Sequence, residues 1–518
     1  MAFDLDPRMV LNKLAFGPTD AELGEMRKSG AEAWLARQLK PDAGDDCAER
    51  IKAAKIHLKY TSKNPDAEVD EDRSLGVIDQ PIEEHWKLLD KSVANNERVF
   101  LRNAVVGATL IRAVHSRWQL REVLVDFWHN HFNVNAAGDS TVAVALPAYD
   151  RDVIRAHALG NFREMLEAVA KSAAMQVYLN NRSSRGGAAN ENYARELFEL
   201  HTLGRPAYLN ALYNKWRDVP GALQGHPQGY IDQDVYEAAR AFTGWTIEDG
   251  AGIGAGRKLP LTGKFTYVET FHDNYQKRLL ATEFDPYQPP MSDGNKVLDL
   301  VADHPATAQY VCGKLCTRLV SDTPDKALVA AAVKVWTEQR RKPDQIARVV
   351  EAIVRSDSFR RSAGAKIKRP LELFVSFARG AGVDLVPTLA LIGTLDGSGQ
   401  RLFGWGPPTG HPDENDYWLS SSMIRARWTL MLGLVEDYWK AGVAAVVPAI
   451  ASRPTPEAAV AAAHQRLLGS EPPPQVTAAI LTGMGLRPGI SLEARKDTVP
   501  VAKRMLAYCA MTPAFQTR

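Results

Sequence analysis

The chain has 518 residues, of which 45% are hydrophobic and 24% are charged, and its formal net charge is +2. This is the composition of a globular protein with a large core, and the near balance of charges excludes bulk electrostatic attraction to nucleic acid or to an acidic membrane. No run of about 18 apolar residues occurs, so no membrane-spanning helix is expected. The start of the sequence lacks a basic segment followed by an apolar block, so we expect a cytoplasmic chain without a secretory signal.

Helical periodicity predominates, and it predicts a mainly α protein with a large multi-helix globular body and a small β-hairpin excursion. The polar segment 41–80 is expected to be a loop or a loosely held helix pair. β-prone residues at Trp245–Ile247 and Lys264–Val268 predict the hairpin. The helices are expected within residues 9–40, 82–118, 120–135, 147–180, 190–204, 232–243, 303–321, 325–337, 342–356, 366–383, 420–440, 455–468, 473–485 and 497–510.

The predicted organisation has two parts. A main helical domain covers residues 1–440, and it includes a lid-like insertion at 205–228 and the hairpin region at 245–270. A C-terminal helical subdomain covers residues 441–518, after a stretch rich in Ala, Val and Pro that is typical of a linker.

The stretch NENYARELFELHTLG, residues 190–204, predicts one helix with a polar face. Asn190 is a suitable N-cap, and Gly204 is suited to the left-handed position that ends a helix. On a helical wheel, where successive residues are about 100° apart, one group of charged and amide side chains lies on one arc. This face is either solvated or the wall of a polar cavity, and its members are Glu191, Asn192, Arg195, Glu196 and Glu199.

A second polar group lies in LREVLVDFWHNHFNVN, residues 120–135. Asp126 and His129 share a helix face three residues apart, whereas His131 points elsewhere. Glu196 and Glu199 have the same spacing in the later helix. If the two helices face each other, three carboxylates and one imidazole converge, and such a set suits Zn, Mn or Fe.

Three hypotheses follow from these residues. The first is a metal-assisted hydrolytic enzyme, in which Asp126, His129, Glu196 and Glu199 hold a divalent metal and Arg195 binds an anionic substrate group. The second is metal-free acid–base catalysis on a glycan, with Glu196 paired with Glu199 or Asp126. The third is a non-catalytic binding or assembly protein, in which the polar face is a buried network that fixes helix register.

Other residues are assigned to the same site. The predicted catalytic residues are Glu196, Arg195, His272 and Asp273, and the predicted substrate-binding residues are Asn192, Trp128, Trp245 and His411. We expect the site between the 120–131 and 190–204 helices, under the 205–228 loop. The expected substrate is a saccharide or a compound that bears a phosphate or ester. Cys312 and Cys316 share a helix face and are expected in the core.

Several stretches together resemble the bacterial domain-of-unknown-function 1800 family. They include DFWHNHFNV, NENYARELFELHTLG, DVYEAARAFTGW, FHDNYQKRLL, KRPLELFVSFARG and LFGWGPPTGHPDENDYW, and the resemblance extends from residue 9 to about 430. It implies a mostly helical fold, a periplasmic or secreted location and an alkaline-phosphatase-like partner protein. The chain departs from the family pattern by extra residues between Gly204 and Gly229 and by its Pro-Pro segment before Trp418.

Overall fold

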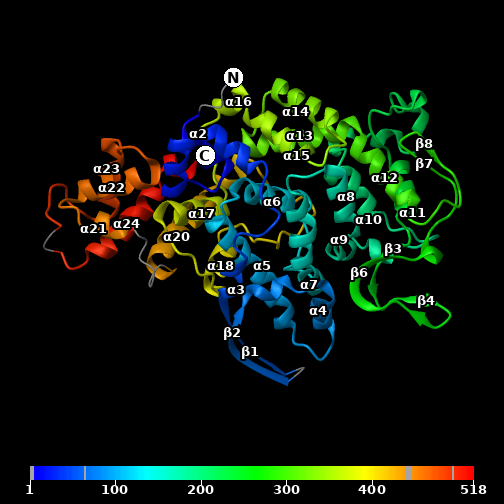
Figure 1. Cartoon of the computed structure of the whole chain (residues 1–518), viewed down its shortest axis with the longest axis horizontal. Helices are drawn as coiled ribbons and strands as arrows, with labels where there is room; N and C mark the ends of the chain where they lie inside the picture. Colours follow the sequence, from blue (N-terminus) through cyan, green and yellow to red (C-terminus); the bar gives the residue numbers. More distant parts are fainter. Residues whose placement is uncertain (1–4, 64–65, 439–445, 493–494) are drawn as a thin grey trace.

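The computed structural model describes residues 5–63, 66–438, 446–492 and 495–518. Helices make up most of this part of the chain, and the described strands form only two-stranded antiparallel pairs (Figure 1). The predicted mainly α fold class is therefore confirmed. None of the described helices is both long enough and apolar enough to cross a lipid bilayer.

The first part of the chain builds the centre of the body around α5 and α6. The elements are α1 (Pro7–Leu14), α2 (Asp20–Gln38), α3 (Ala48–Ala53), β1 (Lys55–Lys63), β2 (Asp66–Ser74), α4 (Ile82–Trp86), α5 (Asn95–His115), α6 (Gln119–His131), α7 (Ser140–Ala148), the π-helix η3 (Tyr149–Arg155), α8 (Phe162–Lys171) and α9 (Ala173–Tyr178).

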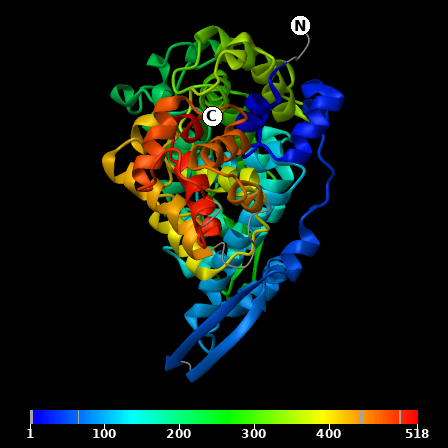
Figure 2. The ribbon, with the colours of Figure 1, turned by 90° about the vertical axis from the view of Figure 1, so that its left-hand side faces the viewer.

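The β1–β2 hairpin corrects one prediction. Lys55–Lys63 and Asp66–Ser74 form a two-stranded antiparallel sheet, not a loop or a helix pair. Side chains of β1 alternate between the two faces, so that Ile56 and Leu58 are buried while their neighbours are exposed. Both strands are rich in charged residues, which hid this alternation in the sequence. The hairpin projects from the body (Figures 1 and 2).

The middle of the chain carries the predicted hairpin. β3 and β6 pair with Trp245 opposite Tyr267 and Ile247 opposite Phe265, which confirms it. The elements are α10 (Glu191–Glu196), the π-helix η5 (Leu197–His201), the 3-10 turns η6 (Arg205–Ala207), η7 (Asn210–Leu212), η8 (Trp216–Asp218) and η9 (Ala222–Gln224), α11 (Asp232–Ala241), β3 (Trp245–Asp249), β4 (Gly252–Gly254), β5 (Arg257–Lys258), β6 (Leu261–Tyr267), β7 (Lys277–Leu279) and β8 (Thr282–Phe284).

The last part of the chain is helical and packs on the same body. α22 contacts both α17 and α24, and one apolar core extends from Val10 to Phe515. The predicted domain boundary at 440–441 lies outside the described residues. The elements are α12 (Ser292–Asp303), α13 (Pro305–Leu319), α14 (Lys326–Glu338), α15 (Gln345–Val354), α16 (Asp357–Arg360), α17 (Pro370–Ala381), α18 (Leu389–Gly397), α19 (Asn415–Trp418), α20 (Ser421–Gly433), α21 (Val447–Ala451), α22 (Pro456–Leu468), α23 (Pro474–Gly483), α24 (Thr498–Ala510) and α25 (Pro513–Gln516).

Helix α6 positions the site because it is buried on nearly every side. Its buried residues include the apolar Leu124 and Trp128, and also the polar Glu122, His129 and His131. Polar and charged groups are costly to bury without partners. The contacts of the polar side chains of α6 therefore indicate where the chemistry of this protein lies.

Candidate functional site

Asp126 lies in a buried ion network. Its Oδ2 accepts hydrogen bonds from Arg318 Nη2, at 3.2 Å, and from Arg369. Arg318 also donates from Nη1 to Glu372 Oε1 at 2.7 Å, and its side chain is 1% exposed. Buried charges are retained when partners of opposite sign compensate them, as they are here. The two guanidinium groups therefore neutralise the Asp126 carboxylate.

His129 belongs to a second buried network. Its Nε2–H donates to Asp150 Oδ1 at 2.9 Å. Asp150, in η3, also accepts from Arg155 Nε at 2.9 Å and from Arg112 Nη1 at 3.3 Å. Burial alone would raise the pKa of Asp150, but these arginines and His129 hold the pKa well below its usual value. Arg155 continues the network to Glu122 through Nη1, at 3.0 and 2.9 Å.

The structure does not gather Asp126, His129, Glu196 and Glu199 around one point. Within the described part of the chain, no three of them bring ligand atoms close enough together to share a metal ion. The two α6 residues face the networks above, while Glu199 Oε1 lies 3.8 Å from Arg205 Nε. Burial and the neighbouring Glu199 raise the pKa of Glu196 to about 7. Glu196 and Glu199 thus act electrostatically as a carboxylate pair.

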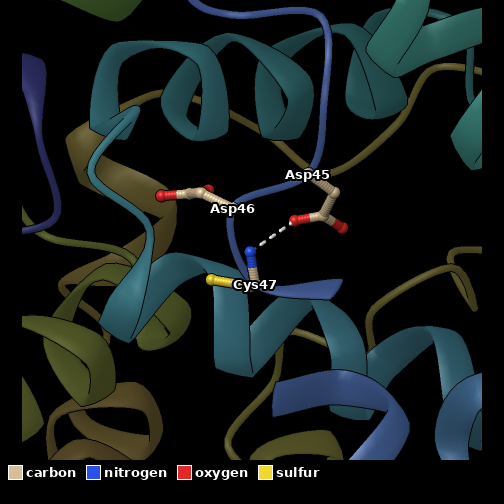
Figure 3. Close-up of side chains that lie close together, drawn as sticks. All are labelled: Asp45, Asp46 and Cys47. Atoms are coloured by element: carbon tan, nitrogen blue, oxygen red, sulfur yellow. Dashed lines mark hydrogen bonds between the residues drawn. The ribbon is translucent and has the colours of Figure 1, made fainter. Parts of the chain in front are cut away.

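Asp45, Asp46 and Cys47 are grouped closely enough to be tested as metal ligands (Figure 3). Asp45 accepts from the Cys47 backbone N–H at 2.9 Å and from Arg112 Nε at 2.7 Å, while Asp46 accepts from the Ser116 hydroxyl at 2.8 Å. Burial and the two aspartates raise the pKa of the Cys47 thiol to about 12. A metal binds the thiolate, whereas this thiol keeps its proton. A metal cation here would also lie beside the positively charged guanidinium of Arg112. These residues therefore do not fit a metal site.

The two helices that the sequence singled out do meet, through His131 and His201. His131 Nε2–H donates to the backbone oxygen of His201 at 3.0 Å, and its Nδ1 lies 3.0 Å from Lys314 Nζ of α13. Burial and the nearby Lys314 hold the pKa of His131 well below its usual range, so the ring is neutral. The carbonyl fixes the proton on Nε2, and Nδ1 is therefore an acceptor for the Lys314 amine.

Lys314 lies on the wall of a solvent-connected pocket, which we call the outer pocket. Burial lowers the pKa of Lys314 to about 8, although Asp413 and Glu414 act in the opposite direction. Tyr310, whose pKa is raised by burial and by Glu199, lies one turn before Lys314. The pocket is lined by Phe127, Asn130, His131, Tyr310, Lys314, Thr317, Thr409, Gly410, His411, Pro412, Asp413 and Glu414.

His201 is fully buried behind this pocket. Both of its ring nitrogens are without a hydrogen-bond partner among the described residues. Burial, together with Lys314, lowers the pKa of His201 to about 3, so this ring is neutral as well. Its ring packs edge-on against Phe132, with centroids 5.1 Å apart. His201 therefore lies in the core, on the apolar side of its helix.

His411 is the one residue predicted to bind substrate that lines the outer pocket as the structure describes it. Its Nε2–H donates to the backbone oxygen of Arg401 at 3.2 Å, and its ring centroid lies 4.5 Å from that of Trp405. Burial lowers the pKa of His411 to about 4, so the ring is neutral and Nδ1 carries a lone pair.

Arg195 and Asn192 of α10 are held by hydrogen bonds to residues outside the outer pocket. Arg195 Nη2 donates to Asp232 Oδ1 at 3.1 Å and to Glu191 Oε2 at 3.3 Å, not to Glu199. Asn192 Nδ2 donates to the backbone oxygen of Leu179 at 3.3 Å. Neither residue is among those that line the outer pocket.

His272 and Asp273 lie in a different network. His272 Nδ1 is 2.8 Å from the Thr243 backbone oxygen, and its Nε2 is 3.3 Å from Asp293 Oδ2. Asp273 accepts from Arg240 Nε and Nη2 at 2.8 and 3.0 Å. Arg240 and other neighbours keep the pKa of Asp273 below its usual value in spite of burial. This network packs β7 and α12 against α11.

Trp128 and Trp245 cannot stack on a substrate in this structure because both side chains are 0% exposed. Trp128 Nε1–H donates to the Ala158 backbone oxygen at 3.0 Å, and Trp245 packs against Phe242 and Phe265. Both are core residues. Tryptophan predicts a large buried surface at least as often as a ligand surface, and sequence alone did not separate the two.

The 205–228 insertion does not cover the outer pocket. The residues that line the pocket include none from this segment in the described part of the chain. The insertion forms four 3-10 turns, and its Val219 and Ala222 form a small apolar cluster with Ile231, which follows the insertion. Residues 225–228 instead border a separate surface pocket beside His304.

Sequence reasoning missed Lys314 and Tyr310, and it set His131 aside. The available signal was a lysine between Cys312 and Cys316, two residues expected in the core. Both cysteines are buried and free, as predicted. A lysine flanked in this way has to place its amine against polar partners. Which partners these are depends on the packing of α13 on α6, which no local pattern contains.

Comparison with protein families gives one match. The family model described as "Protein of unknown function (DUF1800)" matches residues 9–517, which is nearly the whole chain. Comparison with curated proteins and with solved structures gives no match.

Proposed function

The chain belongs to the DUF1800 family, whose description names no activity, and we propose that it is a hydrolytic enzyme in which Lys314 is the general base. The observation that supports this is the contact of 3.0 Å between Lys314 Nζ and His131 Nδ1 on the wall of the outer pocket. General bases work best when their pKa lies close to the pH at which they operate. A lysine with a pKa of about 8 meets this condition.

His131 orients the amine without competing for its lone pair. Its Nδ1 only accepts, because the His201 carbonyl keeps the ring proton on Nε2. A neutral Lys314 therefore directs one N–H to His131, while its nitrogen lone pair remains available to the pocket. In this arrangement Lys314 is the base, and His131 is the group that orients it.

The proposed reaction is the hydrolysis of a carboxylic ester. The Lys314 amine takes a proton from water as the water oxygen bonds to the ester carbonyl carbon. The bond from carbon to the leaving oxygen then breaks, and that oxygen takes the proton from the Lys314 ammonium. Atoms and charge balance, and Lys314 returns to its neutral form. No step requires a metal. Asp126 Oδ2 is already paired with Arg318 and Arg369, and His129 Nε2 with Asp150.

The acidic pair on α10 and η5 lies near the outer pocket on the side of Tyr310. Glu199 is close enough to Tyr310, on the pocket wall, to contribute to the raised pKa of that phenol. Glu196, with a pKa of about 7, is therefore about half protonated near neutral pH. Its catalytic role stays a prediction, and Glu196→Gln tests it.

The test is a set of p-nitrophenyl esters of increasing acyl length, assayed with the whole chain. We expect Lys314→Met to lower kcat/KM by about 10²-fold or more, the usual contribution of a general base. The matched control is Lys334→Met on neighbouring α14, whose side chain is 75% exposed, and it should leave kcat/KM unchanged. Full activity in Lys314→Met would refute the assignment.

A further inference from the structure

A second, inner cavity lies directly behind the outer pocket. It shares Asn130 and His411 with the outer pocket, and about 40 Å³ of it is open to water molecules. About 10–15 Å³ of such space holds one water, so the cavity has room for about three. Its lining residues include Thr109, Glu122, Asp126, Asn130, Arg155 and His411.

Three polar atoms of the residues that line this cavity lack a hydrogen-bond partner among the described residues. They are Thr109 Oγ1, Arg155 Nη2 and His411 Nδ1, and all three atoms are buried. His411 as a whole is 8% exposed. A buried polar atom without a partner costs about 1–3 kcal/mol, so natural proteins rarely leave three of them beside one cavity.

The three atoms differ in what they offer to a ligand. Arg155 Nη2 only donates and the neutral His411 Nδ1 only accepts, while the Thr109 hydroxyl does both. A ligand must therefore contain both donors and acceptors. The charged groups around the cavity already have partners of opposite sign. Glu122 and Asp150 pair with Arg155, and Asp150 also pairs with Arg112. Asp126 pairs with Arg318 and Arg369. An ion would disturb this balance, whereas water fits the size, the donors and acceptors, and the neutrality of the space.

We propose that the inner cavity binds a cluster of ordered waters on Thr109, Arg155 and His411. Because Asn130 and His411 form the boundary with the outer pocket, this cluster supplies the water that is consumed there. The supply role rests on the proposed function, whereas the binding of the cluster does not. The structure thus assigns His411 as a positioning residue for water.

The waters can be counted without any substrate. A high-resolution crystal structure should show water oxygens within about 3.2 Å of the three atoms, and oxygen-17 relaxation dispersion should count the corresponding long-lived waters. Thr109→Val should remove at least one of them, and Thr109→Ser, which keeps the hydroxyl, should retain it. The matched control is Thr317→Val, which lines only the solvent-connected outer pocket and should leave the long-lived count unchanged. Absence of waters at the three atoms, or an unchanged count in Thr109→Val, overturns the proposal.

The supply role has its own readout. With p-nitrophenyl acetate, Thr109→Val should lower kcat several-fold at an unchanged KM, because water supply changes and substrate binding does not. An unchanged kcat in a variant that has lost the water overturns this part. If Lys314→Met is fully active while the waters are present, the general-base assignment fails and the water site stands. The two failures are therefore distinguishable.

Discussion

The side-chain amide of Asn130 makes two hydrogen bonds with the backbone of His411. Its Nδ2 donates to the His411 oxygen at 2.7 Å, and its Oδ1 accepts from the His411 N–H at 2.6 Å. A residue of α6 therefore holds a loop that follows it by 281 positions in the sequence. The same loop supplies Thr409, Gly410 and Asp413 to the outer pocket.

Gly410→Ala should disrupt this attachment. Gly410 has φ +71°, and a Cβ added there would lie 2.1 Å from the Asn130 backbone oxygen. We expect a loss of about 1–3 kcal/mol in the free energy of unfolding, measured by urea denaturation, together with reduced ester hydrolysis. Gly406→Ala, in the same loop, meets nothing within 4 Å and is the matched control. Equal stability of the two variants would contradict this account of the loop.

Asp126→Ala should destabilise the fold strongly. The substitution leaves the guanidinium of Arg369, which is 3% exposed, without one of its carboxylate partners. Breaking a buried ion pair from one side costs about 3–5 kcal/mol, and we expect a loss of that order in urea denaturation. Glu191→Gln, which removes an exposed carboxylate that pairs with Arg195, should change stability by less than about 1 kcal/mol. A small effect of Asp126→Ala would restore this residue as a candidate ligand.

Glu414→Gln should move the pH profile of ester hydrolysis to lower pH. The negative charge of Glu414 helps to raise the pKa of Lys314, so its removal lowers this pKa. The neutral amine then forms at a lower pH, and the rising limb of kcat/KM shifts in the same direction. The shift should shrink in high salt because Glu414 is exposed. Asp416→Asn is the control, and an equal shift in both variants would argue against Lys314 as the titrating group.

Lys368→Met should change how stability depends on pH. Burial lowers the pKa of Lys368 to about 7, below its unfolded value of about 10.4. Between these values the unfolded chain binds more protons, so this lysine makes stability rise with pH by up to about 1.4 kcal/mol per unit. The advantage of the variant over the wild type in urea denaturation should therefore be greatest below pH 7 and fall towards pH 10. A constant difference would show that Lys368 is not buried as described.

The ends of the 190–204 segment could be predicted, but its winding could not. As expected, the side chain of Asn190 caps α10 by accepting from the Asn192 N–H at 3.0 Å. Gly204 has the expected positive φ, +83°, but its ψ of 154° lies outside the left-handed helical region. The α-helix ends at Glu196, however, and η5 follows. The Thr202 hydroxyl donates to the Leu197 oxygen at 2.5 Å. A helical wheel with a fixed step loses its accuracy beyond that point.

The sequence could predict which helices form the candidate site, but it could not predict which residues of those helices contact one another. The prediction that His131 faces away from Asp126 and His129 is confirmed, since His131 contacts Lys314 while the other two face buried ion networks. The sequence contains the spacing within α6, but the partners come from α13, α17 and η3. Those contacts arise from tertiary packing, which cannot be predicted from a single sequence by local patterns.

The π-helix η5 makes this site sensitive to how residues Leu197–His201 are wound. Each turn of a π-helix closes with hydrogen bonds from residue i to i+5, one residue more than an α-helix uses. Winding the same five residues as an ordinary α-helix would turn the following residues by about one residue step, which is about 100° about the helix axis. The His201 carbonyl would then leave His131, whose ring proton could move to the other nitrogen and remove the acceptor for Lys314. The register of a single peptide unit in η5 thus determines the direction in which the amine points.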